Sequence, residues 1–487
     1  MIDNKLKDPS LLRKAAYIDG EWVTADSRST LDVINPATGE SLATVAKVGA
    51  RETSRAVAAA SDAFPDWRDK TAQDRCDLLR KWHDLLLKHQ DDLALLMTLE
   101  QGKPLKEARG EIAYAASFID WFAEEGKRIY GDVIPQHEKG KRLLVLKQPV
   151  GVCAAITPWN FPAAMITRKA GPALAAGCTM VVKPASATPL SALALAELSH
   201  RAGIPRGVFN VVTGSAEEIG TELTSNPLVR KVTFTGSTET GKKLLIACSD
   251  TLKKVTMELG GNAPLIVFDD ADLDAAVEGA IASKFRNNGQ TCVCTNRFLV
   301  QSGIYDDFCH RLAEKVGELK VGNGLAEGTQ LGPLINRAAI DSVEADVADA
   351  LSKGAELICG GKRHSLGGTF FEPTVITGAT TEMNIAAHEI FGPVAPLYRF
   401  EHEEEAISLA NETRYGLASY FYTRNLACAW RVSEALEYGI VGLNTGLIST
   451  AVAPFGGIKQ SGIGREGSKY GIEAYLEIKY LCIGEID

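Results

Sequence analysis

Between residues 150 and 261, short apolar runs alternate regularly with Ala-rich segments of helical periodicity. The runs read as strands: GVCAAIT (151–157), TMVVK (179–183), GVFNVV (207–212), RKVTFT (230–235) and KKVTME (253–258). The segments between them read as helices at 163–176, 188–202, 216–224 and 237–248. Apolar strands that alternate with helices predict an α/β fold with a doubly wound parallel sheet. Such sheets bind ligands at the carboxyl ends of their strands.

The regions on either side of this block predict further helices, a second α/β unit and an arm. Helical periodicity occurs at 50–64, 71–98 and about 105–125, and residues 17–47 hold turn signals typical of small strands in a hairpin. A second alternating block runs from Ala263 to Gly446. The runs 142–148 and 475–483 lie outside both alternations and are expected to pair as an arm, whose exposed edge another subunit would cover.

The composition is that of a soluble globular enzyme. The 487 residues predict two or three domains, with 45% hydrophobic and 23% charged residues. A net charge of -9 without a Lys/Arg block argues against nucleic acid, and no apolar run approaches the roughly 20 residues that span a bilayer. The N-terminus lacks a signal-peptide core. We interpret the ten cysteines as reduced thiols in the cytoplasm, and expect no metal, because Cys292 and Cys294 lack a second pair at zinc-ligand spacing.

Cys292 lies between a predicted helix and a predicted strand. The helix-like segment Asp272–Lys284 runs into Asn287-Asn288-Gly289, and Arg297–Gln301 is a short strand. A thiol on a turn at the end of a sheet is accessible, as a nucleophile must be. A small buried cysteine is the alternative that this stretch leaves open.

Three further motifs place polar groups at strand ends. Two prolines in Thr157–Pro162 hold the backbone around Asn160, which would preorganise its amide as an oxyanion donor. Glu258 is followed by Gly260-Gly261, which permit close approach, and is placed to act as a general base. In Phe234–Gly241 a strand leads into a helix whose N-terminus would hold a pyrophosphate. Each motif also has an ordinary alternative: a proline-rich strand exit, a surface carboxylate or a capped helix.

Together these motifs resemble the NAD(P)-dependent aldehyde dehydrogenase family. The matching segments occur in the family's order over nearly the whole chain: PWNFP at 158–162, VVKPAS at 181–186, FTGSTETG at 234–241, MELGG at 257–261, GQTC at 289–292, EIFGPV at 389–394 and PFGGIKQSG at 454–462. The runs AAMITRKAGPALAAGCTM, ASKFRNNGQTCVCTNR and REGSKYGIEAYLEIKY resemble the succinate-semialdehyde branch of that family.

The resemblance implies a role for each matching residue. Cys292 would attack the aldehyde to form a hemithioacetal, hydride would pass to the nicotinamide, and Glu258 would activate water to hydrolyse the resulting thioester. The Asn160 amide and the Cys292 backbone N–H would hold the oxyanion. Residues matching cofactor-binding positions are Trp159, Asn160, Lys183, Ser186, Gly236, Ser237, Leu259 and Glu389. The substrate carboxylate site of the succinate-semialdehyde branch matches Arg168, Arg286 and Ser449, and a guanidinium fork suits that task.

The resemblance also implies a cofactor preference and an architecture. Ser186 occupies a position where NAD-using relatives commonly carry a glutamate that would repel a 2′-phosphate, so we expect NADP, with NAD usable. The expected architecture is a doubly wound Rossmann-like cofactor domain (1–129 and 148–258), an α/β catalytic domain (259–460), and a small β oligomerisation arm with the C-terminal tail (130–147 and 461–487). A homodimer or homotetramer follows.

The activity expected from the sequence is the NADP-dependent oxidation of succinate semialdehyde to succinate, with glutarate semialdehyde or another carboxylated aldehyde as the alternative substrate. A thiol acyltransferase or hydrolase using Cys292 and Glu258 is another class, but it would leave the five-strand alternation without a ligand. A non-catalytic relative conflicts with the intact set of Asn160, Glu258 and Cys292.

Cys294 suggests redox control of the nucleophile. Residues two apart are at most about 7 Å apart, near the upper edge of Cα separations that permit a disulfide. We hypothesise that peroxide oxidises Cys292 and that a reversible Cys292–Cys294 disulfide then protects it. The other interpretation is that Cys294 is a small residue packed behind the strand.

Overall fold

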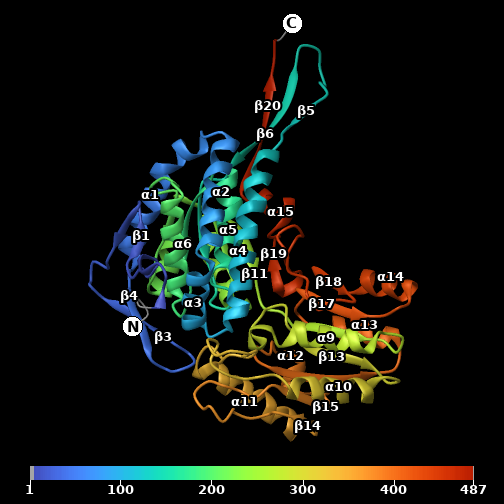
Figure 1. Cartoon of the computed structure of the whole chain (residues 1–487). Coiled ribbons are helices and arrows are strands. Elements are labelled where there is room, and N and C mark those ends of the chain that lie inside the picture. The colour runs from blue at the N-terminus through green and yellow to red at the C-terminus, as the bar shows by residue number, and fades with distance from the viewer. Residues whose placement is uncertain (1–4, 486–487) are drawn as a thin grey trace.

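A mostly parallel eight-stranded sheet forms the first half of the computed structural model, which describes residues 5–485 (Figure 1). Its strand order is β19-β11-β10-β7-β8-β9-β1-β2. The central strands are β7 (Val152–Ile156), β8 (Thr179–Lys183), β9 (Phe209–Val211), β10 (Val229–Thr235) and β11 (Lys254–Glu258). The edges are the antiparallel strands β1 (Ala16–Ile18), β2 (Glu21–Val23) and β19 (Gly462–Ile463). All five strands predicted between residues 150 and 261 are therefore confirmed.

Helices cover both faces of this sheet, as the alternating sequence predicted. The crossover helices are α5 (Ala164–Ala176), α6 (Pro189–Arg201), α7 (Ala216–Ser225) and α8 (Thr238–Ser249). Along β7, Cys153 and Ala155 belong to one apolar core, whereas Val152 and Ala154 belong to another. This alternation places one core on each side of the sheet.

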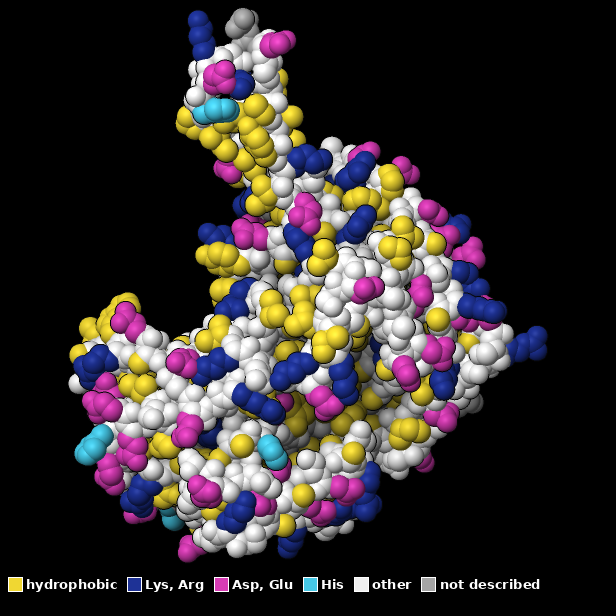
Figure 2. Space-filling model, turned by 180° about the vertical axis from the view of Figure 1, so that it is seen from behind, with side chains coloured by type: hydrophobic (Ala, Val, Ile, Leu, Met, Phe, Trp, Pro, Cys, Tyr) yellow, Lys and Arg dark blue, Asp and Glu magenta, His cyan; other side chains and the backbone are white. Residues whose placement is uncertain are grey.

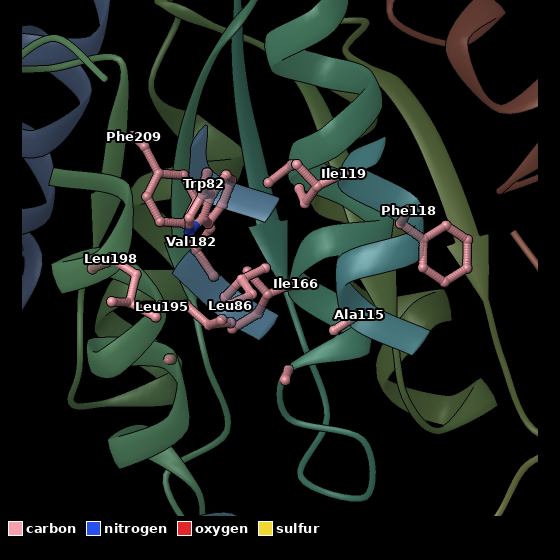
Figure 3. Close-up of a cluster of buried hydrophobic side chains, with 14 of the residues drawn as sticks. Trp82, Leu86, Ala115, Phe118, Ile119, Ile166, Val182, Leu195, Leu198 and Phe209 are labelled. Atoms are coloured by element: carbon pink, nitrogen blue, oxygen red, sulfur yellow. The ribbon is translucent and has the colours of Figure 1, made fainter. Parts of the chain in front are cut away.

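The larger of these cores is built by the N-terminal helices together with α5 and α6. These helices are α2 (Ala72–Lys88), α3 (Gln90–Gln101) and α4 (Leu105–Glu125), whereas α1 (Ala50–Arg68) reaches this core with Trp67 and buries Ala56, Val57 and Ala60 in the other one. In Figure 3, Trp82 and Leu86 lie among Ile166, Val182 and Phe209. The helical pattern predicted from Thr71 to Thr98 is confirmed, and the structure divides it into the two helices α2 and α3. His89 leaves the helical conformation at φ -102° and ψ 18°, and serves as both the C-cap of α2 and the N-cap of α3.

A seven-stranded sheet forms the second half, in the order β14-β15-β16-β13-β12-β17-β18. Its strands are β12 (Ala263–Val267), β13 (Thr295–Gln301), β14 (Glu356–Cys359), β15 (Thr374–Thr377), β16 (Val394–Phe400), β17 (Ala418–Tyr422) and β18 (Ile440–Leu443). Only the pairing of β14 with β15 is antiparallel among these pairs of described strands. The helices are α9 (Leu273–Lys284), α10 (Tyr305–Gly317), α11 (Arg337–Ser352), α12 (Asn384–Ala387), α13 (Glu403–Asn411) and α14 (Leu426–Ala435). The second α/β block is thus confirmed.

A three-stranded arm projects away from both sheets (Figure 1). It contains β5 (Asp132–Ile134), β6 (Arg142–Pro149) and β20 (Leu476–Ile483), and the pairing of β6 with β20 is the one predicted. Residues 462–473, which belong to the C-terminal tail in the predicted division, lie beside the first sheet, because β19 pairs with β11 and α15 (Ser468–Glu473) contacts α4 and α5.

The remaining elements are short. A small hairpin joins β3 (Thr30–Ile34) to β4 (Ser41–Ala46). Single turns of 3₁₀-helix lie at η2 (Pro9–Leu11), η3 (Gly126–Arg128), η4 (Arg286–Gly289) and η5 (Lys459–Ser461).

Candidate active site

The turn that carries Cys292 has a backbone which few residue types adopt. Asn287 and Asn288 have φ values of 51° and 55°, and Gly289 has a φ of 75°. Asparagine tolerates this left-handed region better than most residues. A Cβ on Gly289 would lie 2.1 Å from the Gly392 carbonyl oxygen, so only glycine fits there. The predicted break after α9 is confirmed, and it directs the chain to Cys292.

Glycines bring the end of β11 against this turn. A Cβ on Gly261 would lie 2.4 Å from the Cys292 carbonyl oxygen. A Cβ on Gly260 would lie 2.7 Å from Glu389 Oε2, and Glu389 Oε1 accepts a hydrogen bond of 3.0 Å from the Gly261 N–H. The close approach predicted for Gly260-Gly261 is thus observed, and it joins β11, Glu389 and Cys292.

Cys292 lines two cavities of different character. A first cavity of about 230 Å³ contains six of the predicted residues: Trp159, Asn160, Gly236, Ser237, Leu259 and Glu389. A second cavity of about 300 Å³ contains three more of them: Arg168, Arg286 and Ser449. Phe161, Met165 and Cys292 line both cavities. Glu258, Lys183, Ser186 and Cys294 do not line either of them.

The Asn160 amide is oriented by hydrogen bonds to the Cys292 turn. Its Nδ2 donates to the Gln290 carbonyl oxygen at 3.0 Å. Its own backbone oxygen accepts from Lys103 Nζ at 2.7 Å and from Asn287 Nδ2 at 3.0 Å. An amide nitrogen carries two N–H groups, so one is left to bond an oxyanion next to Cys292.

Buried residues from α4 and the segment before it complete this support, and the sequence did not indicate them. Lys103 Nζ pairs with Glu111 Oε2 at 2.5 Å. Glu111 Oε1 accepts hydrogen bonds from the backbone N–H groups of Ala163 and Ala164 at the start of α5. Glu107 Oε2 accepts from the Asn287 backbone N–H at 2.9 Å. No local motif marks these positions, since the partners of Glu111 in α5 and of Glu107 at Asn287 lie more than 50 residues away in the chain.

Glu258 is a buried carboxyl group without a protein partner. Its exposed fraction is 2%, and neither carboxyl oxygen is hydrogen bonded to any residue in the part of the chain that the structure describes. Burial, together with the negative charge of Glu466, raises its pKa well above the usual range, against the opposing effect of Arg168 and Lys169. A carboxylate whose pKa is raised in this way is a stronger base.

Arg168 forms an ion pair with a carboxylate, Glu466, that the sequence did not indicate. Arg168 Nε lies 2.5 Å from Glu466 Oε2, and Lys169 pairs with the other oxygen of Glu466. The Arg168 guanidinium also stacks on the Phe455 ring, 4.2 Å from its centroid. By contrast, no residue among 5–485 hydrogen bonds to the Arg286 guanidinium, which lies 5.5 Å from the Phe161 centroid. Arg286 is therefore the less compensated cation in the second cavity.

The environment of the half-buried Cys292 thiol favours its protonated form. Burial raises its pKa to about 12; Arg168 acts in the opposite direction, whereas Glu389 and Glu258 raise it further. Cys294 is buried, and its Sγ donates to the Lys284 carbonyl oxygen at 3.4 Å. Burial also raises the pKa of Cys294. Nucleophilic attack by Cys292 therefore requires that its thiol lose a proton.

Lys183 and the start of α8 are suited to an anion. Lys183 ends β8, is buried, and has a pKa lowered to about 8 by burial alone. Within residues 5–485 it has no ion pair, and nearby Ser186 Oγ donates to the Gly214 carbonyl oxygen at 3.4 Å. At α8, Ser237 is the N-cap and Gly236 precedes it, and the first N–H groups of a helix have no partner within that helix. These positions fit the phosphates and ribose of a dinucleotide.

Residues 5–485 contain neither a candidate membrane span nor a candidate metal centre. None of the helices there is both long and apolar enough to cross a membrane. That part of the chain also contains no group of three or more His, Cys, Asp or Glu side chains placed to hold a metal ion.

Comparison with known proteins gives matches over almost the whole chain. The family model described as the aldehyde dehydrogenase family matches residues 22–481. A glutarate-semialdehyde dehydrogenase of Pseudomonas aeruginosa is 65% identical over 482 residues, which is 99% of this chain and 100% of the relative. An NADP(+) succinate-semialdehyde dehydrogenase of Escherichia coli is 64% identical over 480 residues, covering 99% and 100%. The crystal structure of a succinate-semialdehyde dehydrogenase from Burkholderia pseudomallei superposes with a TM-score of 0.98 at 64% identity, covering 98% of this chain and 99% of that one.

Proposed function

The chain belongs to the aldehyde dehydrogenase family, and from this premise we propose that it oxidises succinate semialdehyde to succinate with NADP, while NAD is usable. The second cavity carries this proposal. It contains Cys292 together with Arg286, whose guanidinium has no hydrogen-bond partner among the described residues, and with Arg168 and Ser449. A positive charge without a protein partner beside the nucleophile favours an aldehyde with an anionic end.

The residues on both sides of Cys292 supply the steps of the reaction. Cys292 Sγ attacks the aldehyde carbon as its proton passes to solvent water, and the negative charge that develops on oxygen is stabilised by Asn160 Nδ2–H and the Cys292 backbone N–H. NADP, when bound, supplies the hydride acceptor. Glu258 then takes a proton from water, whose oxygen attacks the thioester carbon. The C–S bond breaks, and Cys292 recovers its proton.

The preference for NADP follows from charge at the end of β8. Lys183 is a buried cation without an acidic partner in the described chain, and Ser186 adds a hydroxyl without adding charge. A 2′-phosphate would compensate the lysine, whereas a glutamate at position 186 would repel that phosphate. The Escherichia coli relative, which is named as NADP(+)-dependent, agrees with this proposal.

Arg286→Ala tests the substrate assignment more cleanly than Arg168→Ala, because losing Arg168 also leaves Glu466 with Lys169 as its only basic ion-pair partner among the described residues. A hydrogen bond to a charged group is worth about 1.5–3 kcal/mol, so kcat/KM for succinate semialdehyde should fall about 10- to 150-fold, mainly through KM. The kcat/KM for butanal should change less than about threefold. The surface variant Arg424→Ala is the control. Equal losses for both aldehydes would contradict the assignment.

Glutarate semialdehyde is the second candidate substrate, and the shape of the second cavity favours it. This cavity reaches Gly110 on α4, where an added Cβ would meet no atom within 4 Å. The cavity is therefore open at this point of its wall, and the Pseudomonas aeruginosa relative is named for the five-carbon aldehyde. The ratio of kcat/KM for the two aldehydes decides between them.

We also propose that the enzyme is a cytoplasmic homodimer or homotetramer that associates through the arm. Val133 and Ile478 on the arm are 79% and 74% exposed, and Figure 2 shows hydrophobic side chains gathered along it. An apolar sheet of this kind is normally covered. Val133→Asp with Ile478→Asp should yield a smaller species by light scattering coupled to size exclusion. The domain division given above (1–129 with 148–258, 259–460, and 130–147 with 461–487) stands as part of this proposal.

The redox hypothesis for Cys294 also stands as a proposal. Cys292 sulfur would attack peroxide and release water as it becomes a sulfenic acid. The Cys294 thiol would then displace a second water to form the disulfide. Because Cys294 Sγ bonds to the Lys284 carbonyl and burial raises the pKa of both thiols, the turn must rearrange, and closure should be slow.

A further inference from the structure

The Tyr114 hydroxyl lies in the wall of the second cavity without a hydrogen-bond partner. Tyr114 is on α4, and its phenol oxygen is buried yet bonded to no protein atom in residues 5–485. The ring packs edge-on against Phe118, with centroids 4.8 Å apart and planes inclined at 64°, which holds its orientation. Leaving a buried hydroxyl unpaired costs about 1–3 kcal/mol. Packing of the fold alone gives no reason to keep it.

One face of α4 presents this hydroxyl to the cavity. Glu107, Gly110, Glu111 and Tyr114 all line it, and their spacing of three or four residues places them on the same side of a helix. The two acids on that face are already engaged, Glu107 by the Asn287 N–H and Glu111 by Lys103 and the start of α5. Tyr114 is therefore the member of this face with a polar atom that the protein leaves unused.

The Tyr114 hydroxyl has a cationic neighbour that cannot accept its proton. Arg168 lines the same cavity and lies close enough to lower the pKa of Tyr114, against the larger, opposing effect of burial. Arg168 Nη2 is itself buried without a hydrogen-bond partner in the described chain. A guanidinium has donors only, so Arg168 can donate to the phenol oxygen but cannot accept from the phenol O–H, whose hydrogen is left without an acceptor. Arg286 adds further donors to the same wall.

We infer that Tyr114 is a specificity-determining residue, whose hydroxyl donates a hydrogen bond to the terminal carboxylate of the aldehyde beside Arg168. The inference rests on the proposed function and names a further residue of its anion site. Because burial raises the pKa of Tyr114 above its ordinary value, the phenol keeps its proton throughout the working pH range and remains a donor. A neutral aldehyde would leave this hydroxyl unpaired, so the same group both favours carboxylated substrates and disfavours uncharged ones.

Tyr114→Phe tests the inference, because it removes one oxygen and keeps the ring. We expect kcat/KM for succinate semialdehyde to fall by about tenfold or more, mainly through a higher KM, because that is the effect of losing one hydrogen bond to a charged group. The kcat/KM for butanal should change by less than about twofold. The Tm of the variant should equal or exceed that of the wild type. Tyr398→Phe is the matched control, since its buried hydroxyl also lacks a partner within the described residues but lies in the core of the seven-stranded sheet. That variant should leave kcat/KM unchanged for both aldehydes.

Succinate binding provides a readout that involves no chemistry. In calorimetric titrations, Tyr114→Phe should raise the Kd for succinate by about the same factor as it raises KM for succinate semialdehyde. Unchanged discrimination between the two aldehydes, or equal losses for both, would overturn the role of Tyr114. If wild type itself showed no preference for the carboxylated aldehyde, the proposed function would fail instead, so the two failures are distinguishable.

Discussion

The pKa of Lys183 makes the NADP assignment testable by measuring how many protons the enzyme takes up when NADP binds, without measuring turnover. Burial alone lowers its pKa to about 8, and no acidic group in the described chain offsets the effect. At pH 8.5, a group with a pKa of about 8 is about three-quarters neutral. A 2′-phosphate has its second pKa near 6 and is already a dianion at that pH. Placing it beside Lys183 should return the pKa of the lysine toward its ordinary 10.5.

NADP binding at pH 8.5 should therefore take up about 0.75 proton per subunit. Titration calorimetry in two buffers of different ionisation enthalpy measures this number directly. Binding of NAD, which lacks the 2′-phosphate, should be accompanied by a smaller proton uptake. The Lys183→Met variant should show no proton uptake when NADP binds. No uptake by wild type, or equal uptake in Lys183→Met, would refute the placement of the phosphate beside Lys183.

The same pKa predicts how stability depends on pH. Because the pKa of Lys183 is depressed on folding, the unfolded chain binds more protons than the folded chain between pH 8 and 10.5. The unfolding free energy of the cofactor-free enzyme therefore gains from this residue as pH rises through that window. The full shift of about 2.5 pKa units corresponds to about 3.4 kcal/mol, an upper limit, which Lys183→Met should recover in part as a higher Tm at pH 7.

Four further predictions concern other parts of the site. Glu258→Gln should keep a pre-steady-state burst of NADPH but slow turnover, and it should remove the fall of kcat that we expect of the wild type as pH drops through the raised pKa of Glu258; absence of the burst in stopped flow would place Glu258 earlier, at thiol activation. Ser186→Glu should move the ratio of kcat/KM toward NAD, and an unchanged ratio would locate selectivity elsewhere. Gly110→Val should lower kcat/KM for glutarate semialdehyde several-fold more than for succinate semialdehyde, unless the longer chain lies away from α4. After peroxide, dithiothreitol should restore activity to wild type but not to Cys294→Ala; equal recovery would show that Cys294 does not protect Cys292.

Local chemistry in the sequence determined the elements and the positions of the reacting groups. The alternation of apolar runs and helical segments predicted all five central strands of the first sheet, since periodicity reflects burial on each face. Asn287-Asn288-Gly289 predicted the end of α9, because those residues tolerate left-handed backbone. Gly260-Gly261 predicted a close approach that the structure places at the Cys292 carbonyl. Such features are readable because their cause lies within a few residues.

The tertiary structure alone decided which groups surround those residues and what charge they carry. Glu466 meets Arg168 and Lys169 from almost 300 residues away, and this contact decides how much positive charge Arg168 offers a substrate. Lys103 reaches the Asn160 carbonyl, and Tyr114 reaches the cavity, only because α4 packs against α5. The pKa values of Cys292, Glu258 and Lys183 likewise depend on burial. Burial is a property of the assembled fold, because it takes elements from both halves of the chain to exclude water from one site.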